Sequence, residues 1–139
     1  MTPARATGIA LALAAAVAAG AWAQPAKDAA QAAEPVMRQL DAFRHGDFDT
    51  AYTFASQEIH EIFDRAAFER MVTTGYPEIA RSTSAVVADS QVAANGNVYL
   101  RLKIRGANGN DVEAVYEMVW EAGAWRINGV VTRPEPGLV

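Results

Sequence analysis

The sequence predicts an α+β protein, with N-terminal helices packed on a four-stranded antiparallel meander sheet. Three observations lead to this fold class. Up to Gly75 the apolar residues recur at helical spacing, and from Ser84 onward they recur at every second position. Short connections join the four predicted strands, which favours a meander. One face of the predicted sheet is apolar, so the helices must cover it.

The first 23 residues have the pattern of a secretory signal peptide. Arg5 lies in a short positive region, residues 9–19 form an apolar run, and Ala21-Trp22-Ala23 resembles a cleavage site. The run is shorter than the roughly 20 residues that span a bilayer. We therefore expect a periplasmic or secreted protein that begins at Gln24 and has no membrane anchor after cleavage. An uncleaved N-terminal anchor is the alternative.

The composition excludes several classes of partner and site. The chain has 12 Lys and Arg against 16 Asp and Glu, so its charge gives no reason to expect nucleic acid or an anionic membrane. It has no cysteine, which excludes disulfides, thiol nucleophiles and thiolate metal sites. Two histidines without a matching carboxylate cluster do not make a metal site. We expect no metal and no cofactor.

The mature chain is long enough for one domain. Residues 24–34, rich in alanine, are predicted to be a flexible tether, with a frayed helix start as the alternative. Residues 35–132 are predicted to be the single domain, and residues 133–139 a flexible tail. The first helix is expected to begin at Pro35, because proline suits the first helical position.

Short polar residues predict where the remaining helices begin. Three of them are expected N-caps: Asp47, Ser56 and Asp64. The last of these helices ends at Gly75, and Tyr76-Pro77 leaves the helical region, because a residue before proline avoids the α conformation.

The strands are expected at about residues 84–92, 98–105, 111–121 and 125–132, and the loops between them set their register. The opposed pairs nearest the three loops are Val92 with Val98, Ile104 with Val112, and Trp120 with Trp125. Further from its turn, the first loop places Ala88 opposite Leu102. All three registers keep the apolar residues on one face. No charged residue lies on the inward face that they define: Val86, Ala88, Ser90, Val92, Val98, Leu100, Leu102, Ile104, Val112, Ala114, Tyr116, Met118, Trp120, Trp125, Ile127, Gly129 and Val131.

Several stretches together resemble a known bacterial domain family. They are Leu40-Asp41-Ala42-Phe43-Arg44, Gly46-Asp47, Ala51-Tyr52-Thr53-Phe54-Ala55-Ser56, Phe68-x-x-Met71-Val72, Gly75-Tyr76-Pro77 and Gly123-Ala124-Trp125-Arg126-Ile127. Over most of residues 35–132 the chain resembles the domain of unknown function 4864 family, which looks like part of the nuclear-transport-factor-2-like superfamily. The resemblance implies a cone of helices closing over a curved sheet, often around a pocket. It implies no activity, since that superfamily holds both enzymes and plain binding domains.

Aromatic residues are the candidates for a ligand site inside such a cone. The expected ligand-binding set is Tyr52, Phe63, Tyr76, Tyr116 and Trp120. Each has a structural alternative: a buried tyrosine often satisfies its hydroxyl within a core, and Trp120 with Trp125 can clamp a hairpin. A catalytic base would have to come from the helices, where His60 is the best candidate and a surface histidine the alternative.

The outward face of the sheet carries charges and valines. We expect ion pairs of Asp89 with Arg101 and of Lys103 with Glu113 across the strands. An apolar patch there could make a homodimer, and its expected residues are Tyr99, Val115, Val119 and Val130, with Val115 opposite Val130. Scattered surface valines are the alternative.

The sequence thus favours an exported, non-catalytic domain that binds a small apolar or aromatic ligand, or a protein partner. Two alternatives stay open. One is an isomerase- or dehydratase-like enzyme that uses the cone pocket, and the other is a structural module that assembles through the outer sheet face.

Overall fold

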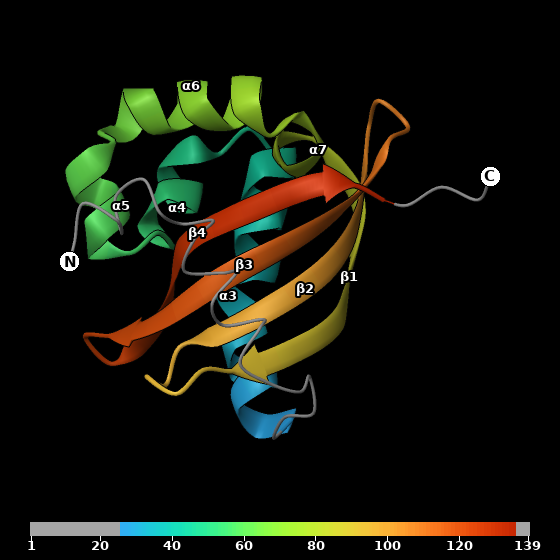
Figure 1. Ribbon diagram of the computed structural model, residues 1–139. Helices are drawn as coiled ribbons and strands as arrows, with labels where there is room; N and C mark the ends of the chain where they lie inside the picture. The colour runs from blue at the N-terminus through green and yellow to red at the C-terminus, as the bar shows by residue number, and fades with distance from the viewer. Residues whose placement is uncertain (1–25, 136–139) are drawn as a thin grey trace.

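The computed structural model describes residues 26–135 and confirms the predicted fold class. Its helices are α3 (Ala26–Arg44), α4 (Phe48–Thr53), α5 (Gln57–Ile62), α6 (Arg65–Gly75) and α7 (Pro77–Ala80). Its strands are β1 (Ser82–Val92), β2 (Val98–Gly106), β3 (Asp111–Glu121) and β4 (Ala124–Pro134). The strands form one antiparallel sheet in chain order, with α3 lying across one of its faces (Figure 1).

Helix α3 begins nine residues before the predicted start, so residues 26–34 are helical and Pro35 lies inside the helix. The expectation that the helix begins at Pro35 is wrong. Alanine is the strongest helix former, and the apolar stripe continues through Ala32, which is buried like Val36 and Leu40. Packing of this stripe on the sheet outweighs the cost of an internal proline. The predicted signal peptide and residues 136–139 lie outside the described residues, and β4 extends to Pro134 in the predicted tail.

The three predicted N-caps are confirmed. The side chain of Asp47 accepts a hydrogen bond from the backbone N–H of Thr50, and Ser56 and Asp64 do the same for Ile59 and Ala67. The helical region does not end at Tyr76 as expected, because Pro77 opens the additional short helix α7.

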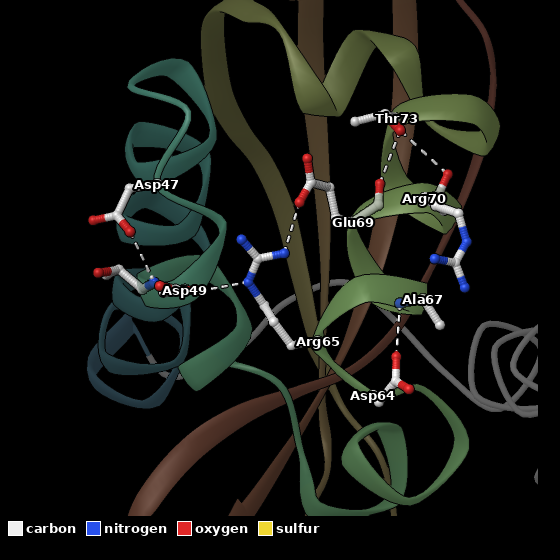
Figure 2. A network of polar contacts seen from close by, with 9 residues as sticks. Asp47, Asp49, Asp64, Arg65, Ala67, Glu69, Arg70 and Thr73 are labelled. Atoms are coloured by element: carbon white, nitrogen blue, oxygen red, sulfur yellow. Dashed lines mark hydrogen bonds and ion pairs between the residues drawn. The ribbon is translucent and has the colours of Figure 1, made fainter.

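Arg65 joins α4 to α6 (Figure 2). Its Nε donates to Asp49 at 2.5 Å and its Nη1 donates to Glu69 at 2.7 Å, so one guanidinium bridges the two helices. Its guanidinium also lies 5.7 Å from the centre of the Phe48 ring. This bridge positions α6, whose other side helps to enclose the interior.

The predicted registers are confirmed next to each hairpin loop: Val92 pairs with Val98, Ile104 with Val112, and Trp120 with Trp125. Further along β1 the prediction is wrong, because a bulge at Ala88 pairs Val87 with Leu102. One extra residue exchanges the two faces of the strand, so Val86 points outward and is 63% exposed.

A second bulge, at Asn128 in β4, corrects the prediction at the other edge of the sheet. Val130 lies opposite Tyr116 on the inner face, and Val131 lies opposite Val115 on the outer face. The expected pair of Val115 with Val130 is therefore wrong, for the same physical reason.

Candidate functional site

A cavity of about 150 Å³ lies between the helices and the inner side of β3 and β4. Its wall comes from α3, the segment before α5, α5, α6, α7 and both strands. The lining residues are Gln39, Phe43, Ala55, Ile59, Phe63, Phe68, Met71, Val72, Tyr76, Ile79, Tyr116, Ile127, Gly129 and Val130. The wall is therefore almost entirely aliphatic and aromatic, and the described residues that line it include no Asp, Glu, His, Lys or Arg.

Tyr116 is the most unusual residue of this wall. Its side chain is 1% exposed, and its hydroxyl has no hydrogen-bond partner among the described residues. Burial, together with the nearby Tyr76, raises the pKa of the Tyr116 hydroxyl above its ordinary value, so the group stays protonated. A buried polar group without a partner costs about 1–3 kcal/mol. Such a group is rare in native proteins and points to a partner from outside the described residues.

The other two polar residues of the wall already have partners. The hydroxyl of Tyr76 donates a long hydrogen bond of 3.4 Å to the carbonyl oxygen of Val130. The amide Nε2 of Gln39 donates to the carbonyl oxygen of Ala51 at 3.1 Å. Both bonds hold the wall together, and Gln39 keeps a second N–H and its amide oxygen.

Three of the five residues expected to bind a ligand line this cavity: Phe63, Tyr76 and Tyr116. Tyr52 does not line it, since its hydroxyl donates to the carbonyl oxygen of Phe63 at 2.6 Å and its ring packs on Phe68. Trp120 is also elsewhere: it is 59% exposed and meets Trp125 edge-on, with the ring centres 5.4 Å apart.

His60, the weak catalytic candidate, lies on the exposed side of α5. Its ring stacks on Tyr52 with the centres 4.0 Å apart, and its Nε2 lies 2.8 Å from the carbonyl oxygen of that tyrosine. These contacts join α5 to α4, and the histidine does not line the cavity.

Sequence reasoning missed Val130 and several helical residues of the wall. Val130 was assigned to the outer face because the bulge at Asn128 leaves no signal in the alternating pattern. Phe43, Phe68 and Met71 belong to the apolar residues that recur at helical spacing before Gly75, and that periodicity was the available signal. It shows that a residue points inward, but it does not show which inward residues surround a space.

The outer face of the sheet is dominated by polar contacts. Arg101 pairs with Asp89 as predicted. Glu113 lies opposite Lys103 in the register, but it binds Arg101 at 3.2 Å and Arg133 at 2.5 Å. The predicted pair of Lys103 with Glu113 is therefore not formed.

Of the four residues expected at an interface, Val130 belongs to the cavity wall. Tyr99 is 2% exposed, and its hydroxyl donates to the carboxyl of Glu117 at 3.0 Å. Val115 and Val119 are half-buried. The four residues therefore do not form one exposed apolar patch on the outer face.

Within residues 26–135 no group of three or more His, Asp and Glu side chains is placed to hold a metal ion. None of the helices in this part of the chain is long and apolar enough to cross a membrane. A protein-family model described as Domain of unknown function (DUF4864) matches residues 25–138. No curated protein and no solved structure matches the chain.

Proposed function

The chain belongs to the family described as Domain of unknown function (DUF4864), and we propose from its geometry that it binds a small, neutral, mainly apolar molecule in the cavity. The observation that carries the proposal is the cavity of about 150 Å³ with an aliphatic and aromatic wall. An apolar cavity of about this size takes up benzene or xenon in an engineered protein. The expected ligand is therefore about the size of one substituted ring.

The chemistry of the wall supports a neutral ligand. Moving an isolated charge into an apolar interior is very costly unless a partner of opposite charge is present. The lining residues supply aromatic rings, aliphatic groups, one amide and two phenol hydroxyls, and no charged side chain. A carboxylate or an ammonium ion would have no partner there.

Binding fits this wall better than acid–base catalysis does. A general acid or base must lie within hydrogen-bond reach of the reacting atoms and exchange its proton near the working pH. His60 lies outside the cavity, and the raised pKa of Tyr116 makes its hydroxyl a weak acid.

The way in is proposed to lie between α6 and β4. Four lining residues keep part of their surface exposed: Phe63, Met71, Tyr76 and Val130. Two further proposals come from the sequence. The signal-peptide pattern supports binding outside the cytoplasm. The arrangement of helices on one face of a four-stranded sheet supports kinship with nuclear-transport-factor-2-like domains.

Filling the cavity tests the proposal. We expect Val130→Phe to place a ring inside the cavity and to weaken binding of isopropylbenzene at least tenfold, measured by chemical-shift titration of the purified protein. Val131→Phe is the matched control, because Val131 is the next residue of β4, is also half-buried and faces outward. Equal binding by both variants, or no binding of isopropylbenzene to the original protein, would sink the proposal.

A further inference from the structure

Gln39 is a polar residue of the cavity wall whose hydrogen-bonding capacity is only partly used. It lies in α3, is 4% exposed and lines the cavity, so the small surface that it keeps borders that space. Its Nε2 donates to the carbonyl oxygen of Ala51 at 3.1 Å, and no described residue donates to its Oε1. A buried amide oxygen without a donor is costly, and a ligand that brings a donor removes this cost.

The contact with Ala51 fixes which end of the amide is open. The carbonyl oxygen of Ala51 needs a donor, so it holds the nitrogen of Gln39 and leaves the amide oxygen to the other side. This oxygen is not among the fully enclosed polar atoms that lack a partner, whereas the hydroxyl oxygen of Tyr116 is. The Oε1 of Gln39 therefore keeps accessible surface on the wall of the cavity.

We propose that the ligand is a ring-sized phenol, whose hydroxyl donates to Oε1 of Gln39 while its ring packs on the apolar wall. This inference rests on the proposed function, because it concerns the ligand of the same cavity. It adds a chemical class to a site that the volume and the polarity of the cavity define only coarsely.

A hydroxyl group fits the open capacity of Gln39 better than other polar groups do. Its proton goes to Oε1, and its oxygen is an acceptor for the second N–H of the amide, so one small group meets both needs. A ketone or an ether has no proton for Oε1, which would stay unsatisfied. A primary amide brings two N–H groups, one of which would lack an acceptor in this apolar surrounding.

The rest of the wall favours an aromatic ring as the carrier of this hydroxyl. Phe43 and Phe68 stack on the helical side, with the ring centres 6.1 Å apart and an angle of 27° between the planes. Faces and edges of such rings pack well on another aromatic ring. The phenol group has an ordinary pKa of about 10, so the ligand enters neutral at pH 7, as a wall without described charged residues requires.

The test compares three probes that differ in one group. p-Cresol carries a hydroxyl where p-xylene carries a methyl group and 4-fluorotoluene carries fluorine, so only p-cresol donates a hydrogen bond. The dissociation constants are measured by chemical-shift titration for the original protein and for Gln39→Met, which keeps the length of the side chain and removes the amide. The coupling is the factor by which the substitution weakens p-cresol, divided by the factor for p-xylene. This ratio cancels differences in how water solvates the probes and any change in the cavity that follows from the lost bond to Ala51.

We expect a coupling of about threefold to tenfold for p-cresol, as one neutral hydrogen bond supplies, and of less than about twofold for 4-fluorotoluene. Tyr76→Phe is the matched control, because it removes a polar group of the same wall whose proton already has an acceptor, and its coupling with p-cresol should stay below about twofold. A second measurement needs no substitution. In the original protein the ¹⁵N resonance of Gln39 Nε2 should move further with p-cresol than with p-xylene, while that of the exposed Gln57 stays in place.

A coupling below about twofold at Gln39 overturns the phenol class. It is also overturned by an equal coupling for 4-fluorotoluene, or by a p-cresol coupling that arises with Tyr76→Phe instead. If Gln39→Met does not fold, equal ¹⁵N shifts with p-cresol and p-xylene overturn it. In these cases p-xylene still binds, so the proposed cavity function stands without the inference. If none of the probes binds the original protein, the cavity function and this inference both fail.

Discussion

Removing the hydroxyl of Tyr116 is expected to keep or raise stability, although most substitutions of a fully buried residue lower it. The ring of Tyr116 contributes to the core, and Tyr116→Phe retains that ring. The substitution removes only the oxygen, which is buried without a partner among the described residues. The substitution therefore breaks no hydrogen bond to a described residue, and it removes the free-energy cost of burying a hydroxyl that lacks one.

The magnitude follows from that cost. An unsatisfied buried donor costs about 1–3 kcal/mol, part of which local adjustment recovers, so we expect a gain of about 0–2 kcal/mol in the free energy of unfolding. For a domain of roughly 100 residues, each kcal/mol shifts the Tm by about 4 °C or more.

Tyr99→Phe is the matched comparison. Tyr99 is equally buried, at 2% exposed, but its hydroxyl donates to the carboxyl of Glu117 at 3.0 Å. Removal of that hydroxyl breaks a bond and leaves a buried acceptor with fewer donors, so we expect a loss of about 1–3 kcal/mol. The same chemical change should therefore have opposite signs at the two positions.

Urea unfolding of the original protein and both variants, without added ligand, gives the free energies, and the Tm from calorimetry checks them. Unchanged m-values are needed for the comparison, because a changed slope means a changed unfolded or native state. A loss above about 1 kcal/mol in Tyr116→Phe would refute the reasoning, since it would mean that the hydroxyl has a stabilising partner in the folded protein.

Three further predictions concern other parts of the chain. Pro35→Ala is expected to raise the free energy of unfolding, by up to the about 3 kcal/mol that an internal proline costs a helix, and a lower Tm in calorimetry would contradict this. The amide of Asn108 lowers the pKa of the Glu78 carboxyl, so this group stabilises the fold above about pH 4.3 and loses its effect as the pH falls through its folded pKa. The free energy of unfolding should consequently fall less between about pH 5 and pH 3 in Glu78→Gln than in the original protein, and equal slopes would argue against a role for this carboxyl. Finally, N-terminal sequencing of protein exported by a bacterial host should begin at Gln24, whereas an intact Met1 would favour the uncleaved anchor.

The sequence predicted those parts of the fold that local chemistry decides. Caps such as Asp47 and Ser56 depend on one side chain reaching a backbone N–H three residues on, and both were found. The hairpin registers depend on loop length and on glycine in the turn, and they hold beside every loop. The start of α3 was missed because a favourable local rule for Pro35 competes with packing that local rules do not contain.

The candidate site was predicted less completely, because it depends on how elements pack against one another. Tyr116 was placed correctly, since its position follows from the register of β2 with β3. Tyr52 was expected in the pocket as one of the aromatic residues, but its hydroxyl donates to the backbone carbonyl of Phe63 instead. A face of a helix includes residues that fill space and residues that border it, and only the docking of α4, α5 and α6 separates them.

The bulge at Asn128 connects the shape of the cavity to its anchoring. Beyond the bulge, Val130 faces the cavity and its carbonyl oxygen receives the hydroxyl of Tyr76. At the bulge itself, the side chain of Asn128 accepts from the hydroxyl of Ser56 at 2.6 Å and donates to Glu117 at 3.2 Å. Ser56 also caps α5, so the extra residue in β4 both turns Val130 toward the cavity and holds the cap of a helix that covers it. A feature without a sequence signal thus positions the site, which explains why local patterns predicted the sheet better than its pocket.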